Sequence, residues 1–225
     1  MRLARSNPSD RFGRLLVIII LTFIVSGISQ DWATSLAAFL NLVLVVVAFR
    51  TTSISVSVPR ATVLASIAVG AVIVSVVADN GSEFAAVSAF AQAALLTVLI
   101  LAILRAVLKH EQVTIQTIVG AIAAYALIGM AFSWFFLGMD SVSDTQFSMD
   151  PTDATAYPEF SFVVLTTLGF GNQLPTASFA ARFTVMEAML GQIFLATFVA
   201  RLVSLYPRRV ATVDVIEEPS PGDGA

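Results

Sequence analysis

Six apolar runs, separated by short polar segments, make up most of this chain and limit its fold more than any other feature. They span residues 15–28, 32–49, 61–78, 84–108, 113–138 and 178–206. Five of the six reach the roughly 17–25 residues that a helix needs to cross a bilayer. With 57% hydrophobic and 12% charged residues, the chain has too little polar surface to coat a soluble globule. The sequence therefore predicts an all-α, polytopic membrane protein with six transmembrane helices.

The first run is the shortest, and it follows several arginines. A basic start and a short apolar core are also typical of a cleavable signal peptide. Because no clear cleavage site follows and the second run begins almost at once, we favour a membrane helix.

The placement of charge predicts the orientation of the helices. If all six runs span, eleven of the twelve basic residues fall on one side and only Arg182 lies near the other. Basic loops stay in the cytoplasm, so both termini are expected there, in a plasma (cell inner) membrane. The opposite side receives eight acids: Asp31, Asp79, Glu83, Asp140, Asp144, Asp150, Asp153 and Glu159.

One short segment between the last two runs differs from the others. It begins at Tyr157, carries Pro158 at a position suited to the first turn of a helix, and ends in Thr166-Thr167-Leu168-Gly169-Phe170-Gly171-Asn172. Two glycines at alternate positions permit positive φ, which can turn successive carbonyls toward one line. Such backbone is tolerated at membrane depth only inside protein or along a water-filled path. The stretch is therefore either a loop outside the membrane or part of a pore, and the apolar runs on both sides of it favour a pore.

Residues 157–206 resemble the pore region of the potassium-channel family, whose usual filter is Thr-Val-Gly-Tyr-Gly-Asp. The resemblance implies one re-entrant pore helix followed by a selectivity-filter loop. The resemblance implies stacked potassium sites made by Thr167, Leu168, Gly169, Phe170 and Gly171, with Thr166 and Asn172 supporting the pore mouth. It also implies a homotetramer, because only one such loop exists in the chain and the family's ring of carbonyls needs about four copies.

Three departures from the family pattern bear on selectivity. Phe170 lacks a phenol, Phe160 stands where many members have an indole, and Asn172 replaces an acid. Hydrogen bonds that brace the filter in those members cannot form here. A weakly selective cation channel is therefore the nearest alternative to a potassium-selective one.

The last apolar run contains further candidates. An intramembrane carboxylate is a functional hypothesis by default, and we expect Glu187 to brace the filter from behind, the alternative being that it lines the ion path. Gly191, twenty residues after Gly171, is either a gating hinge or a site of close helix packing. Three polar residues are expected to be interhelical hydrogen-bond partners: Thr184, Gln192 and Thr197.

The fourth run lacks the repeated arginines of a voltage sensor. Only Arg105 and Lys109 lie at its cytoplasmic end, where they are expected to anchor the topology, and His110 beside them is expected to be a solvated interfacial residue. We predict three parts: a four-helix membrane domain (1–110), a pore domain (111–209) and a disordered cytoplasmic tail (210–225).

The predicted function is passive potassium conduction without strong voltage dependence. Its partners would be potassium ions, membrane lipid and further copies of the chain, with no cofactor and no nucleic acid. An enzyme is disfavoured, because no nucleotide loop, metal cluster or catalytic triad is visible in the sequence. The alternative from another class is a non-conducting regulatory membrane subunit that retains the pore fold; a secondary transporter is disfavoured because no paired broken helices appear.

Overall fold

The described residues of the computed structural model fold into helices. The structure describes residues 10–28, 36, 39–40, 43–44, 82–108, 114–143, 145–149 and 155–204. Within them lie α1 (Asp10–Ser26), α4 (Ser82–Leu108), α5 (Ile115–Val142), α6 (Ala156–Leu165) and α7 (Ser178–Ser204). No strand occurs among these residues. The predicted runs 32–49 and 61–78, His110 and the tail from residue 205 fall wholly or almost wholly outside them.

Three of the helices are long and apolar enough to cross a membrane. They are Ala85–Leu108 within α4, Ile115–Val142 and Ser178–Ser204. The all-helical, polytopic membrane architecture is thus as predicted for the described part of the chain, whereas a total of six spans stays a prediction.

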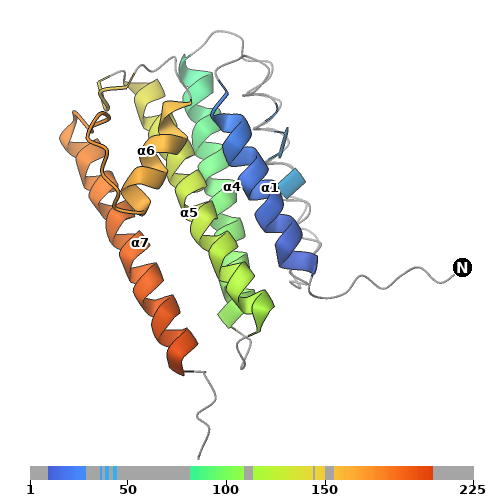
Figure 1. Ribbon diagram of the computed structural model, residues 1–225. Helices are drawn as coiled ribbons and strands as arrows, with labels where there is room; N and C mark the ends of the chain where they lie inside the picture. The colour runs from blue at the N-terminus through green and yellow to red at the C-terminus, as the bar shows by residue number, and fades with distance from the viewer. Residues whose placement is uncertain are drawn as a thin grey trace, which may run out of the picture.

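Helices α1 and α4 both pack against α5 (Figure 1). Their shared core joins Leu15 and Ile19 of α1 to Leu96 and Ile103 of α4 and to small residues of α5, such as Ala124. Small side chains let helix backbones approach closely. Inside a membrane, helices associate through such close packing because the hydrophobic effect does not drive them together.

A second core holds the start of α6. Phe136 of α5 is its centre, with ring centroids 5.4 Å from Phe160 of α6 and 5.2 Å from Phe147 of the segment that precedes α6. The bulky Phe160 therefore holds α6 against α5 by aromatic packing, without the hydrogen-bond donor that an indole would carry.

Helix α5 is one turn longer than the sequence predicted. It was expected to end at Gly138, but it continues to Val142. The additional turn contains Asp140, which is fully buried. It accepts hydrogen bonds from the Tyr157 hydroxyl (2.6 Å) and from the backbone amide of Gln146 (3.1 Å). Because both carboxylate oxygens are paired, the acid can stay inside the protein and the helix need not stop before it. Asp140, one of the eight acids predicted to lie opposite the basic loops, is thus a buried structural acid.

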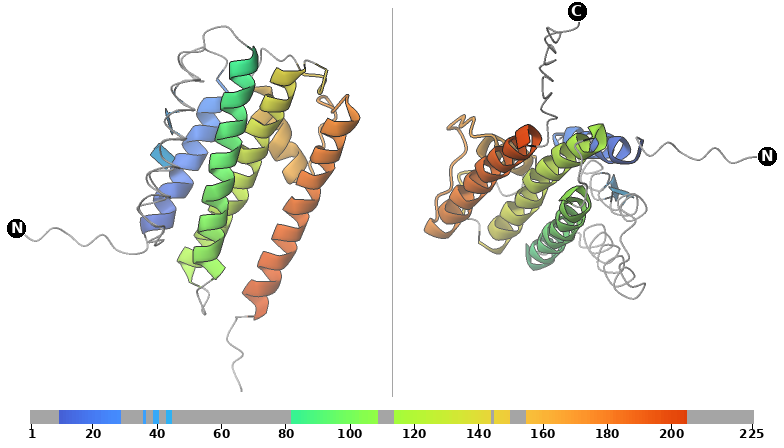
Figure 2. Two further views of the ribbon diagram at one scale, coloured as in Figure 1. Left: turned by 180° about the vertical axis from the view of Figure 1, so that it is seen from behind. Right: turned by 90° about the horizontal axis from the view of Figure 1, so that it is seen from below.

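Helix α6 lies between the C-terminal end of α5 and the N-terminal end of α7, as Figures 1 and 2 both show. The longer α7 buries only Ala180, Glu187 and Gly191. Most of its large apolar side chains are exposed in the single chain. A helix that is apolar on nearly all sides is typical of one surrounded by lipid and by neighbouring helices.

Candidate functional site

The loop after α6 alternates between ordinary and left-handed backbone. Thr167, Gly169 and Gly171 have φ values of 58°, 62° and 76°. The glycines take this conformation without a Cβ penalty, whereas Thr167 is an uncommon non-glycine example. The sequence pattern pointed to the two glycines but not to Thr167, because threonine has no intrinsic preference for positive φ.

The end of α6 leads directly into this loop. The amides of Thr166, Thr167 and Leu168 bond back to the carbonyls of Phe162 (3.0 Å), Val164 (3.0 Å) and Val163 (2.9 Å). The Thr166 hydroxyl also donates to the Phe162 carbonyl at 2.6 Å. The last turn is therefore closed on itself, and its partially negative end faces the start of the loop.

The loop itself is open on one side. Leu168 and Phe170 are 65% and 62% exposed, and no atom would lie within 4 Å of a Cβ on Gly169 or Gly171. Asn172 is also exposed. One face of the loop is thus uncovered in the single chain.

Helix α7 supports the loop from the other side through one polar contact. The Gln192 amide lies 3.4 Å from the Thr167 hydroxyl, which in turn donates to the Thr166 carbonyl at 2.7 Å. Thr184, expected to pair between helices, instead bonds to the Ala180 carbonyl of its own helix at 2.9 Å. That prediction was wrong because a threonine in a helix readily satisfies its hydroxyl with the carbonyl four residues earlier.

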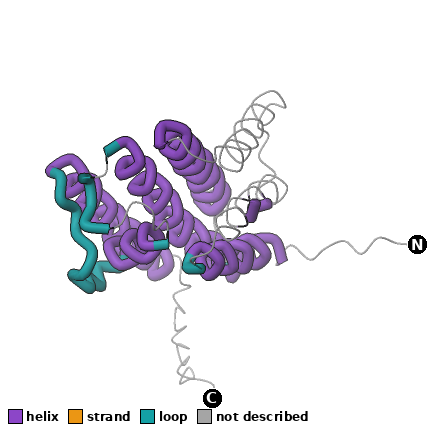
Figure 3. The backbone as a smooth tube through the Cα atoms, turned by 90° about the horizontal axis from the view of Figure 1, so that it is seen from above, coloured by secondary structure: helices purple, strands orange, loops and turns teal. Residues whose placement is uncertain are grey.

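A short segment before α6 is hydrogen-bonded to the part of the loop that leads into α7. The Ser148 amide donates to the Leu174 carbonyl (2.8 Å), the Leu174 amide donates to the Ser148 hydroxyl (2.9 Å), and the Thr176 amide donates to the Gln146 carbonyl (2.9 Å). This outer strap, residues 145–149 against 174–177, lies with the other loop segments at one side of the helices (Figure 3).

Behind the loop, three helices meet in two layers one turn apart. In the first, the Ser161 hydroxyl of α6 lies 2.7 Å from the Gly129 carbonyl of α5 and 2.5 Å from Glu187 Oε1 of α7. Ser161 and Glu187 are both fully buried. Glu187 is therefore placed against α6, away from the open face of the loop.

In the second layer, the Tyr125 hydroxyl of α5 donates to the Leu165 carbonyl of α6 at 3.0 Å, and Gly191 of α7 lies beneath the same carbonyl. Each helix contributes residues four positions apart, namely 125 and 129, 161 and 165, and 187 and 191. Sequence reasoning missed Tyr125 and Gly129; a lone tyrosine in an apolar run, which needs a partner for its hydroxyl, was the available signal.

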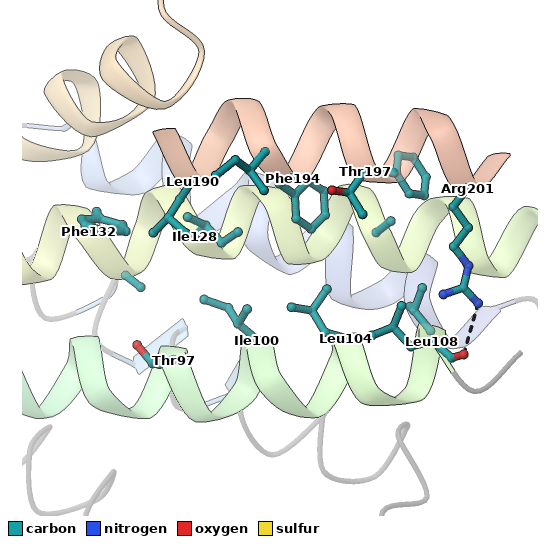
Figure 4. Close-up of a pocket in the computed structure, with 15 residues that line it drawn as sticks. Thr97, Ile100, Leu104, Leu108, Ile128, Phe132, Leu190, Phe194, Thr197 and Arg201 are labelled. Carbon is teal, nitrogen blue, oxygen red and sulfur yellow. Dashed lines mark hydrogen bonds between the residues drawn. The ribbon is translucent and has the colours of Figure 1, made fainter. Parts of the chain in front are cut away.

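A groove separates the far half of α7 from α4 and α5. It has a volume of about 460 Å³ and an almost entirely apolar lining that includes Ile100, Leu104, Phe194 and Thr197. Arg201 closes one end by donating to the Leu108 carbonyl, the C-terminal end of α4, at 3.1 Å (Figure 4). A cation is favoured at that helix end. Thr197 therefore faces a groove and not the filter loop.

No curated protein and no solved structure is significantly similar to this chain. A family model described as "Ion channel" matches residues 120–207, which hold most of α5 and all of α6, the loop and α7. That stretch contains both layers behind the loop and the row of left-handed residues within it. This part of the chain is therefore similar to an ion-channel domain, and it lies in a helical membrane protein.

Proposed function

We propose that this protein is a potassium-selective channel that conducts passively through a ring of four copies, in a plasma membrane with both termini in the cytoplasm. The observation that carries the proposal is the alternation of positive φ at Thr167, Gly169 and Gly171 directly after the pore helix. Alternating left-handed residues turn successive carbonyls to one side, where they can replace the water around a cation.

The open face of the loop supports assembly around an axis. A single row of carbonyls cannot surround an ion, and the exposed Leu168 and Phe170 leave room for neighbouring copies. Four copies related by cyclic symmetry would close the ring. Potassium is the permeant ion in this proposal, and no cofactor is needed.

The proposed channel is not strongly voltage-dependent. A voltage sensor needs several charges that move through the field, each contributing about 2.3 kcal/mol per 100 mV. Arg105, in the last turn of α4, is the only basic residue of that helix.

The test is potassium and sodium flux through the purified full chain in liposomes. Potassium-dominated flux that Gly169→Ala abolishes would support the proposal, because alanine is strained at a φ of 62°. Gly13→Ala is the matched control: Gly13 lies in α1 with nothing within 4 Å of its Cβ, so flux should be unchanged.

A binding measurement separates a closed channel from a protein that is no channel. An ion that binds only the folded state raises the unfolding temperature by mass action. Potassium should therefore stabilise the protein more than sodium at equal ionic strength, and Gly169→Ala should remove the difference. Equal effects of the two ions with equal fluxes would favour a weakly selective cation channel instead. Absence of both flux and potassium stabilisation would favour a non-conducting subunit.

A further inference from the structure

The Ser161 hydroxyl has two oxygen neighbours but only one hydrogen. Ser161 Oγ lies 2.7 Å from the Gly129 carbonyl oxygen and 2.5 Å from Glu187 Oε1. Both distances are within the range of an O–H···O hydrogen bond. A carbonyl oxygen can only accept, so the hydrogen between Ser161 and Gly129 must come from Ser161.

That assignment leaves no serine hydrogen for Glu187. An ionised carboxylate can only accept, so an ionised Glu187 would place two oxygens 2.5 Å apart with no hydrogen between them. A protonated Glu187 removes the conflict, because its own hydrogen fills the contact and Ser161 Oγ accepts it.

The surroundings of the second carboxyl oxygen of Glu187, Oε2, agree with a neutral carboxylic acid. Glu187 Oε2 is buried and has no hydrogen-bond partner among the described residues. No salt bridge joins Glu187 to any residue that the structure describes. The nearby phenol of Tyr125 gives its hydrogen to the Leu165 carbonyl and not to Glu187. A buried carboxylate with one free oxygen and no cation is strongly disfavoured, whereas a neutral carbonyl oxygen in that place is tolerated much better.

We infer that Glu187 is a neutral carboxylic acid whose proton is donated to Ser161, so that hydrogen bonds run in one direction from Glu187 of α7 through Ser161 of α6 to Gly129 of α5. This three-helix relay makes Glu187 a positioning residue. It holds the pore helix one turn before Leu165, where the helix ends and the filter loop begins. The relay stands on these contacts alone; its effect on conduction rests on the proposed channel function.

The direct test is infrared difference spectroscopy of the full chain in lipid, with wild type compared with Glu187→Gln at neutral pH. We expect the carbonyl stretch of a protonated acid in wild type, shifted in heavy water and absent from the variant. The matched control is Glu159→Gln, since Glu159 is exposed on the same pore helix and its replacement should leave the protonated-acid band of Glu187 in place. Carboxylate bands assigned to Glu187 would overturn the inference, whether or not the protein conducts.

Variants test whether a neutral hydrogen-bonding side chain at position 187 is enough for the relay. The amide of Glu187→Gln can donate to Ser161 and should keep most of the potassium flux and of the potassium-over-sodium ratio. Glu187→Ala and Ser161→Ala remove a member of the relay and should lower flux by about tenfold. A Glu187→Gln variant as impaired as Glu187→Ala would overturn the relay. If the wild type itself carries no flux, the channel proposal fails, while the infrared result still decides the protonation of Glu187.

Discussion

Gly191 of α7 lies so close to the end of the pore helix that a Cβ on it would come within 2.4 Å of the Leu165 carbonyl oxygen. The same oxygen accepts the Tyr125 hydroxyl of α5 at 3.0 Å. Leu165 is the last residue of α6, so this single carbonyl contacts both neighbouring helices next to the start of the glycine-rich loop. The close approach supports a packing role for Gly191; whether the helix also bends there stays a prediction.

Gly191→Ala should destabilise the protein and disturb the filter. The new methyl group meets backbone, which cannot rotate away, so α7 must move from α6 at a cost of about 1–3 kcal/mol. Thermal unfolding in lipid, together with potassium flux, would measure both effects.

Gly129→Ala and Gly13→Ala are the variants with which the stability loss of Gly191→Ala is compared. A Cβ on Gly129 meets the edge of the Phe162 ring at 2.9 Å, and a ring can tilt, so we expect a smaller loss than at Gly191. Gly13→Ala should raise stability by about 0.5–1 kcal/mol, because alanine is the better helix former in open space. Gly191→Ala as harmless as Gly13→Ala would contradict the packing of α7 against Leu165.

Tyr157→Phe should destabilise the protein more than Tyr125→Phe does. The Tyr157 hydroxyl donates to the carboxylate of buried Asp140 at 2.6 Å, whereas Tyr125 donates to a neutral carbonyl. Hydrogen bonds to charged groups contribute about 1.5–3 kcal/mol and neutral ones about 0.5–1.5 kcal/mol. Equilibrium unfolding of both variants in the same detergent provides the comparison, and the reverse order would show that Asp140 does not depend on Tyr157.

Ser148→Ala should loosen the outer strap without moving α5, α6 or α7. The substitution removes the acceptor of the Leu174 amide while the Ser148 amide keeps its bond to the Leu174 carbonyl. We expect faster hydrogen exchange at Leu174 and unchanged exchange in the α5 helix. Thr184→Ala is the matched control, because that hydroxyl bonds within its own helix. Unchanged exchange at Leu174 would mean that backbone pairing alone holds the strap.

Arg201→Ala should free the far end of α7 from α4, since it removes the donor to the Leu108 carbonyl. The chain has no cysteine, so spin labels can be placed at the exposed Val203 and Leu101 without background. With labelled chains diluted among unlabelled ones, the distance distribution should broaden in the variant. Arg182→Ala, near the opposite end of α7, should leave it unchanged. An unaltered distribution in Arg201→Ala would show that the apolar groove alone holds the helix end.

Much of the architecture was predictable because it depends on local composition. Apolar runs of bilayer length predicted α4, α5 and α7 to within about one turn, and the run after Pro158 predicted α6. The one-turn error at the end of α5 arose at Asp140, where an acid looked like the start of an exposed loop. Only its distant partner Tyr157, seventeen residues later, makes it a buried residue.

In the candidate site, too, the sequence predicted one part and only the structure shows the other. The spacing of Gly169 and Gly171 predicted a loop with positive φ, since glycine's lack of a Cβ is a property of the residue itself. Thr167 shares that conformation without such a preference, and its amide and hydroxyl bond to the carbonyls of Val164 and Thr166.

By itself, the sequence determined that this chain belongs in a membrane, where its helices lie, and which short segment carries the glycine-rich loop, because hydropathy and backbone freedom are local properties. Only the tertiary structure decided that Gly129, Ser161 and Glu187 meet in one layer, and that Tyr125, Leu165 and Gly191 meet in the next. Hydrogen bonds and close contacts of this kind join residues 26 to 40 positions apart, and their partners are chosen by the packing of whole helices, which no local pattern specifies.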